Sequence, residues 1–105
     1  MVRYQELVLE VSATQGINVY SIDYQLNLKQ LMTITTFKDQ SLHIADVFYS
    51  EEKLYVLCHD NGLFVYLRKA DNFIAVDSLA LDVGLKIQYT HLTMKDNNIF
   101  IAFDN

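Results

Sequence analysis

The sequence predicts an all-β fold made of four-stranded antiparallel units, and three observations support this class. β-Branched and aromatic residues gather in short segments that polar turn residues separate, which is typical of strands joined by hairpins. Similar stretches recur along the chain at a spacing of about 45 residues. The 105-residue chain has no Pro and only three Gly, so Asn, Asp, Ser and Lys must form most of its turns.

Nine segments are predicted to be strands. In chain order they are ELVLEVS (6–12), INVYSI (17–22), LNLKQLMTI (26–34), LHIADVFY (42–49), KLYVLCH (53–59), LFVYLR (63–68), FIAVDSLAL (73–81), IQYTHLTM (87–94) and NIFIAF (98–103). Most connections between them have the length of hairpin loops. A helix is the alternative for 24–32, which is rich in Leu, Gln and Lys, and for 46–57, where some apolar residues lie three and four apart. Strands are favoured because helices would break the repetition of the neighbouring segments.

The repetition can be followed by aligning the chain with itself. The stretch GINVY (16–20) matches GLFVY (62–66) at a shift of 62 − 16 = 46 residues. Residues 44–57 match 89–102 at a shift of 89 − 44 = 45, which aligns Leu54-Tyr55-Val56 with Ile99-Phe100-Ile101. The chain is therefore predicted to be one repeat region, 1–105, with a partial copy at 6–34, a full copy at 42–81 and a partial copy at 87–105.

The turn inside the full copy carries the strongest local signal. Asn61-Gly62 follows Asp60 between two apolar segments, and Asn-Gly favours a two-residue hairpin turn in which both residues have a positive φ. This turn is predicted to join the second and third strands of the copy.

Several strands are apolar on both faces. Leu54, Val56 and Cys58 alternate with Tyr55 and Leu57, so both sides of that strand need cover. The same holds for 63–67 and 99–102. Stacking one antiparallel unit on the next would supply this cover.

These features resemble a known family. The stretches LYVLCHDNGLFVY (54–66), VLEVSATQGINVYSID (8–23) and NIFIAFDN (98–105) are similar to blades of WD40-like and LVIVD-type β-propellers, with VYSI (19–22) and VYLR (65–68) where the former carry Trp-Asp. The resemblance implies an interaction scaffold more often than an enzyme.

The length allows only part of a propeller. At about 45 residues each, the chain supplies 105/45, or about 2.3 blades, whereas roughly four to eight close a ring. The expected state is an incomplete ring: a fragment of a longer protein, a ring completed by other copies or another chain, or an open stack. Exposed strand edges, expected at 6–12 and 98–103, would then bind a partner strand by β-augmentation. An oligomer or a tight complex is therefore predicted.

Charge and composition argue against nucleic acid and membranes as partners. The net charge is −5, the pI is about 4.9 and no Lys/Arg cluster is present, which argues against nucleic acid and against an anionic membrane surface. A single cysteine, Cys58, rules out an internal disulfide, and the sequence shows no signal peptide and no apolar run long enough for a membrane span. These features predict a cytoplasmic protein.

Few residues are candidates for chemistry. The polar residues considered first are His43, Asp46, His59, Asp60, His91 and Asp104. Asp46 and His91 occupy equivalent repeat positions and could form an acid–base pair or bind a metal, but structural hydrogen bonds are the stronger interpretation. His59 and Asp60 are expected to stabilise the turn that follows them. Cys58 is expected to be buried on the strand face opposite His59.

The remaining candidates are loops and tyrosines. The loops 50–53 and 95–98 lack the ligand spacing of a calcium site and are expected to be solvated turns. Tyr20, Tyr55, Tyr66 and Tyr89 could stack on sugars or peptides, but core positions are the stronger interpretation. The sequence thus assigns no catalytic, cofactor-binding or metal-binding residue and predicts a non-enzymatic protein–protein interaction or scaffold module. The alternative is a small-ligand or carbohydrate-binding repeat protein.

Overall fold

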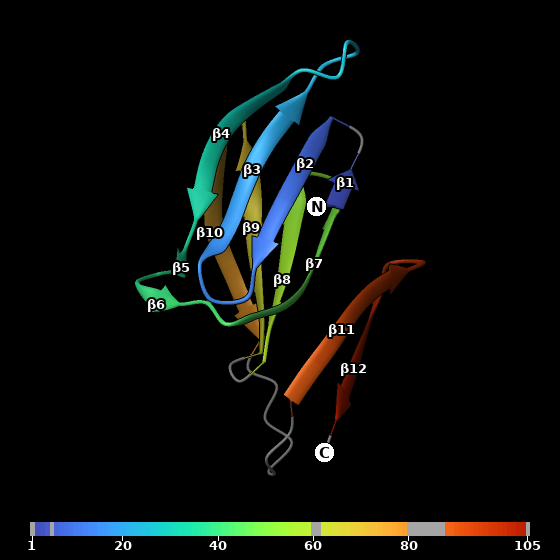
Figure 1. The fold of residues 1–105 in the computed structure, drawn as a ribbon. Coiled ribbons are helices and arrows are strands. Elements are labelled where there is room, and N and C mark those ends of the chain that lie inside the picture. Colours follow the sequence, from blue (N-terminus) through green and yellow to red (C-terminus); the bar gives the residue numbers. More distant parts are fainter. Residues whose placement is uncertain (1, 5, 60–61, 80–87, 105) are drawn as a thin grey trace.

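The structure, a computed structural model, describes residues 2–4, 6–59, 62–79 and 88–104. These residues form strands and turns, in two four-stranded antiparallel sheets and two hairpins (Figure 1). The predicted all-β fold with repeated four-stranded antiparallel sheets is confirmed, and no sheet closes on itself in the described part of the chain. None of the described residues belongs to a helix with the length and apolarity to cross a membrane.

The first unit contains β1 (Val2–Tyr4), β2 (Leu7–Ser12), β3 (Gly16–Ile22) and β4 (Leu28–Ile34), paired in chain order. Strand β1 was not predicted, because three residues are too few to show an alternating pattern. It pairs with the first half of β2, with Val2 opposite Leu9 and Tyr4 opposite Leu7. The expectation that residues 6–12 form an open sheet edge is therefore wrong: β2 lies between β1 and β3, and the edges are β1 and β4.

The second unit contains β7 (Ile44–Ser50), β8 (Lys53–Cys58), β9 (Gly62–Lys69) and β10 (Asn72–Leu79), again paired in chain order. A hairpin joins β8 and β9, as predicted, but its register differs from that of the expected two-residue Asn61-Gly62 turn. Gly62 already belongs to β9 and pairs with Cys58, so the connection is longer than two residues. The turn residues Asp60 and Asn61, and the end of the segment predicted at 73–81, lie outside the described residues.

A short hairpin connects the first two units. It contains β5 (Thr36–Phe37) and β6 (Gln40–Ser41), where the sequence indicated only a loop. Phe37 is buried and stacks on Phe64 of β9, with ring centroids 4.6 Å apart, and it meets Tyr66 edge-on at 5.5 Å. The connection thus closes one end of the core between the two sheets.

The third unit contributes two described strands, β11 (Gln88–Lys95) and β12 (Asn98–Asp104), which pair only with each other among the described residues. Its turn, Asp96-Asn97, has φ values of 52° and 67°, and the matching turn of the second unit, Glu51-Glu52, has 52° and 66°. Both are two-residue hairpin turns with two left-handed residues. The helices weighed for 24–32 and 46–57 do not form.

The glycines of the two GxxVY stretches have a common backbone conformation. Gly16 and Gly62 begin the third strand of their units with φ values of 97° and 110°. An added Cβ at Gly16 would lie 2.2 Å from the carbonyl oxygen of Ile34. Glycine is required there because only a residue without a side chain tolerates both the positive φ and the close approach of β4.

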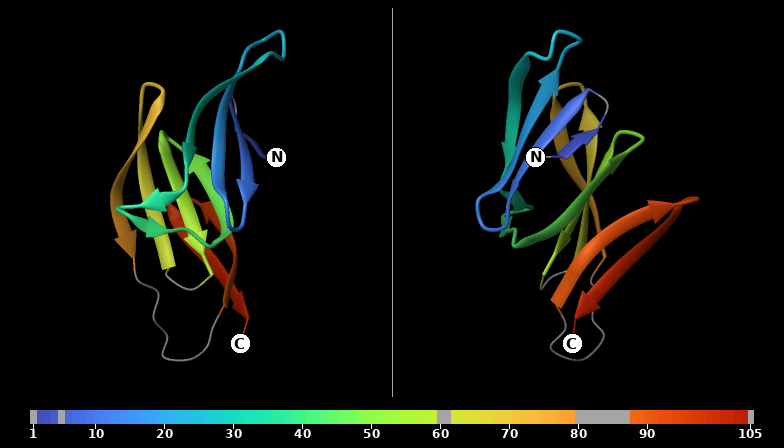
Figure 2. Two further views of the ribbon diagram at one scale, coloured as in Figure 1. Left: turned by 60° about the vertical axis from the view of Figure 1, so that its left-hand side comes forward. Right: turned by 45° about the vertical axis from the view of Figure 1, so that its right-hand side comes forward.

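The units are stacked face to face (Figures 1 and 2), and each interface has its own core. The first and second units bury a cluster that includes Leu9, Ile17, Val19, Leu54 and Val56. On the opposite face of the second unit, a smaller cluster joins Leu57 and Leu63 to Leu92 of β11, with Tyr55 and Ile101 packed against it. The predicted alternation along β8, in which both faces need cover, is therefore confirmed.

Candidate interaction surface

Two hydrogen bonds connect the first strands of neighbouring units, β1, β7 and β11. The hydroxyl of Tyr4 on β1 donates to the carbonyl oxygen of Val47 on β7 at 3.2 Å. Burial and, secondarily, the nearby Asp46 carboxylate raise the pKa of Tyr4, so this hydroxyl keeps its proton and remains a donor. On the other side of β7, the Oδ2 atom of Asp46 accepts the backbone N–H of Leu92 on β11 at 2.9 Å.

Asp46 is a structural residue between the second and third units. Its Oδ1 atom accepts its neighbour's backbone N–H, that of Val47, at 2.9 Å, while Oδ2 reaches β11. The register of β7 shifts between Ile44 and Asp46, and this bulge aims the carboxylate out of the sheet. His91, the repeat-equivalent residue, is exposed and its Nδ1 lies 3.1 Å from the hydroxyl of Thr90. Asp46 and His91 therefore have separate hydrogen-bond partners, and the acid–base pair considered from the sequence is not formed.

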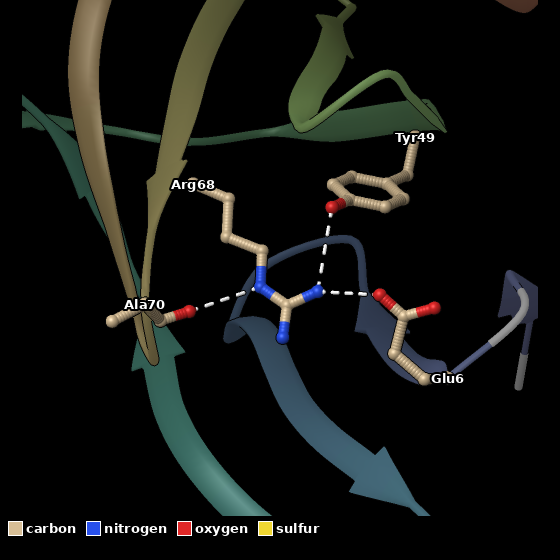
Figure 3. Close-up of polar contacts among 4 residues, drawn as sticks. All are labelled: Glu6, Tyr49, Arg68 and Ala70. Carbon is tan, nitrogen blue, oxygen red and sulfur yellow. Dashed lines mark hydrogen bonds and ion pairs between the residues drawn. The ribbon is translucent and has the colours of Figure 1, made fainter.

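A polar junction also joins the first two units, and the ring of Tyr49 connects it to Tyr4 (Figure 3). The Nη1 atom of Arg68 on β9 lies 2.7 Å from Oε1 of Glu6 and 3.5 Å from the hydroxyl of Tyr49, and its Nε donates to the carbonyl of Ala70 at 3.0 Å. Hydrogen bonds to its own backbone N–H and to Arg68 lower the pKa of Glu6. The Arg68 side chain is 17% exposed and that of Glu6 is 51% exposed, so this ion pair is partly screened by water.

A cavity of about 600 Å³ lies beside this junction. It is lined by Arg3, Tyr4, Glu6, Tyr49, Ser50, Glu51 and Glu52. The loop 50–53 was expected to be a solvated turn, and its two glutamates are exposed, but they also form one wall of this cavity. Sequence reasoning missed the cavity because its residues come from β1, β7 and two turns, which no local pattern connects.

The other candidates for chemistry do not converge on one site. Cys58 is fully buried with Leu54 and Val56, as predicted, so its thiol does not meet solvent. The backbone N–H of His59 donates to the carbonyl of His43 at 2.9 Å, which extends the pairing of β8 with β7. Asp60 and the side chain of Asp104 lie outside the described residues.

The tyrosines considered for stacking have different surroundings. Tyr66 is 3% exposed, and its hydroxyl donates to the carbonyl of Thr36 at 2.8 Å. Burial, with a smaller effect from Cys58, raises the pKa of Tyr66. Tyr55 packs against the cluster under the third unit, and Tyr20 is partly exposed on β3. Tyr55 and Tyr66 are thus core residues, while the side chain of Tyr89 lies outside the described residues.

The outer face of the first unit is polar. Asn18 on β3 donates to Oε1 of Glu10 on β2 at 2.8 Å and accepts from the hydroxyl of Thr33 on β4 at 2.8 Å. Gln30 extends this ladder by donating to Thr33 at 3.2 Å. These side chains alternate with core residues such as Leu9 and Val19, so they lie on the face turned away from the second unit.

The second unit, by contrast, is only partly covered on the face that meets the third. Strand β11 lies against β7 and β8, and Leu63 at the start of β9 is buried beneath it. Farther out on β10, Ile74 is 48% exposed and Leu79 is 56% exposed. Ile74 alternates with the core residues Phe73 and Ala75, and Leu79 pairs with Leu63, so both side chains lie on the face toward the third unit.

The described residues contain no group of three or more His, Cys, Asp or Glu that could hold a metal ion. Comparisons with family models, with curated proteins and with solved structures found no match to this chain. The candidate surface is the partly covered face of β9 and β10.

Proposed function

We propose that the chain is a protein–protein interaction or scaffold module, a subunit or fragment of a larger assembly of propeller-type blades. The observation that carries the proposal is the apolar surface of β10, where Ile74 and Leu79 on the face toward the third unit are 48% and 56% exposed and Val76 at the bulge is 45% exposed. Large apolar side chains gathered on one sheet face mark sites of association.

The arrangement of the units supports the blade interpretation. Each sheet is ordered as a meander, and the first strands β1, β7 and β11 follow one another from unit to unit through the Tyr4–Val47 and Asp46–Leu92 hydrogen bonds. Propeller blades are four-stranded antiparallel sheets stacked radially in the same way. The polar ladder makes the outer face of the first unit less suited to apolar packing than the β10 surface, so association is expected on the side of the third unit.

The oligomeric state tests the proposal. Sedimentation velocity over a hundredfold concentration range, with the chain alone and with its co-purified proteins, is expected to show a multimer or a stoichiometric complex. A compact monomer at every concentration, with no complex, would refute it. Ile74→Asp should weaken the association, whereas Leu28→Asp on β4 should not; Leu28, which is also 48% exposed, is the matched control.

A second function is supported by the cavity beside Arg68. Its wall carries Tyr4 and Tyr49 together with charged groups from Arg3, Glu51 and Glu52. Aromatic rings next to charged hydrogen-bonding groups suit a small polar ligand such as a carbohydrate. A glycan array with hits that Tyr49→Ala abolishes would favour this function, and an array without hits would reject it for carbohydrates.

A further inference from the structure

We infer that the loop between β3 and β4, residues 23–27, is a preformed anchor that inserts Tyr24 and Leu26 into an apolar pocket of a partner protein. This loop, the β3–β4 tip, belongs to the first unit and contains none of the residues of the β10 surface. It therefore adds to the proposed interaction function a second contact surface that does not depend on the first.

The two apolar side chains of the β3–β4 tip lie almost entirely in water. Tyr24 is 93% exposed and Leu26 is 67% exposed, the two highest values for large apolar side chains among the described residues. The loop projects past the neighbouring strand ends in every view (Figures 1 and 2). The other hairpin turns whose residues are all described carry small or polar side chains instead: Ala13-Thr14-Gln15, Lys38-Asp39, Glu51-Glu52, Ala70-Asp71 and Asp96-Asn97.

Hydrogen bonds fix the shape of the tip before any partner binds. The Oδ1 atom of Asp23 accepts the backbone N–H groups of Gln25 and Asn27, each at 2.9 Å, and the backbone N–H of Leu26 donates to the carbonyl of Asp23 at 3.0 Å. The bonds from Asn27 and Gln25 lower the pKa of Asp23, so its carboxylate remains an acceptor at neutral pH. Leu28 already belongs to the sheet as the first residue of β4 and is not part of the tip. An ordered loop loses less conformational entropy when it binds, so these bonds favour association.

Leu26 has a backbone conformation that a large apolar residue rarely adopts. Its φ of 65° lies in the left-handed region, where Gly and Asn are the usual residues. The other described non-glycine residues with a positive φ are Lys, Asp, Glu, Ala and Asn. Folding alone would favour Asn or Gly at this position, so the apolar side chain of Leu26 serves a contact outside its own unit.

Stacking of further units does not cover this position. The equivalent turn of the second unit, Ala70-Asp71, stays exposed although the first unit is stacked on that sheet. Tyr24 and Leu26 stay exposed although the second unit is stacked on the other face of the first. A unit added to the outer face of the first unit would take the place that the first takes on the second, and would leave the tip in water. The repeat geometry therefore favours a separate molecule as the occupant.

The side chains of the tip indicate the chemistry of that molecule. A tyrosine ring buries a large apolar area and brings a hydroxyl that needs a hydrogen-bond partner, so the pocket should be apolar with one polar group at its base. Tyrosine is also enriched at the centres of protein interfaces. A lipid surface suits the tip less well, because two side chains give little membrane affinity and the net charge of −5 repels anionic lipids. A protein with a concave apolar pocket is therefore the occupant that fits.

Photo-crosslinking followed by a binding measurement tests the inference. A benzophenone maleimide attached to Gln25→Cys lies between the two anchors, and Cys58 is fully buried and does not compete for the label. The same label on Asp71→Cys, in the equivalent turn of the second unit, is the matched control. Irradiation in a lysate of the source cells should attach the Gln25→Cys chain to a protein that the control does not capture. That protein is then purified without label.

Isothermal titration calorimetry with the purified protein gives the decisive result. It should bind the wild-type chain, and bind Tyr24→Ser and Leu26→Asn at least tenfold more weakly. Because Asn tolerates the φ of 65°, the urea midpoint of Leu26→Asn should be no lower than that of wild type, which separates a lost contact from a lost fold. Ala70→Ser and Ile74→Asp should bind within twofold of wild type, since they change the other turn and the β10 surface.

Four results would overturn the inference. They are cross-links no different from those of Asp71→Cys, equal binding of wild type, Tyr24→Ser and Leu26→Asn, a cross-linked second copy of the chain, and binding to phosphatidylcholine vesicles that Tyr24→Ser abolishes. The last two would assign the tip to self-association or to a lipid surface. None of them concerns the β10 surface, which Ile74→Asp tests by sedimentation, so failure at the tip leaves the proposed function standing.

Discussion

Gly16→Ala should be the most damaging single-methyl change in the first unit. Gly16 begins β3 with a φ of 97°, a conformation that costs an L-residue roughly 1–2 kcal/mol. The added Cβ would also lie 2.2 Å from the carbonyl oxygen of Ile34 and 3.1 Å from the Cα of Thr35. Both neighbours are backbone atoms, so the clash cannot be relieved by rotating a side chain.

The loss of stability in Gly16→Ala depends on how far β4 must be displaced. Ile34 is buried in the core and pairs with Ile17, so a displacement of β4 by about 1 Å would disturb packing between the first two units. Conformational strain and displaced packing together should lower the free energy of unfolding by about 3 kcal/mol, within the range that such mechanisms give. For a small domain, this is a large share of a total stability of about 5–15 kcal/mol.

Urea unfolding followed by far-ultraviolet circular dichroism would measure the loss. With a urea dependence of about 1–3 kcal/mol/M, the midpoint should fall by about 1–3 M. Thr14→Ala in the same turn is the control, because Thr14 is exposed and its replacement should change stability by less than about 0.5 kcal/mol. A Gly16→Ala variant as stable as the Thr14→Ala variant would refute the close approach of β4 to Gly16.

Three further changes test the junctions and turns. Asp46→Ala removes the acceptor of the Leu92 N–H, so that amide should exchange at least tenfold faster while the amides of β3 keep their rates; an unchanged rate at Leu92 would contradict the contact. The lowered pKa of Glu6 means that its contribution to stability is present above its usual pKa of 4.5 and is lost as the pH falls through its lower folded-state pKa. Glu6→Gln should therefore cost under about 1 kcal/mol at pH 7 in urea unfolding, with the difference from wild type shrinking toward pH 3; a constant difference would show that Arg68 does not act on this carboxylate. Glu52→Gly should raise the free energy of unfolding by about 1 kcal/mol because the φ of 66° then costs no strain, and a loss of stability in the same assay would contradict the hairpin turn.

The strands were largely predictable because their signal is local. Side chains alternate between the two faces of a strand, so Leu54, Val56 and Cys58 could be assigned to one face and Leu57 to the other before any contact was known. The spacing of the hairpin turns then placed the strand ends within one or two residues for most segments. Strand β1 was not predicted because it has only three residues and its extended conformation depends on pairing with Leu7–Leu9.

The sequence by itself thus determined the strands, the turns and their repetition, since backbone conformation and alternation depend on neighbouring residues. The tertiary structure decided which surfaces the units bury and which they leave open. Val19 and Val65 stand at equivalent repeat positions, yet one is fully covered and the other partly exposed, because burial depends on the unit stacked above. Likewise, the Asp46 carboxylate accepts the backbone N–H of Leu92 because the stacking of β11 on β7 brings together residues 46 positions apart.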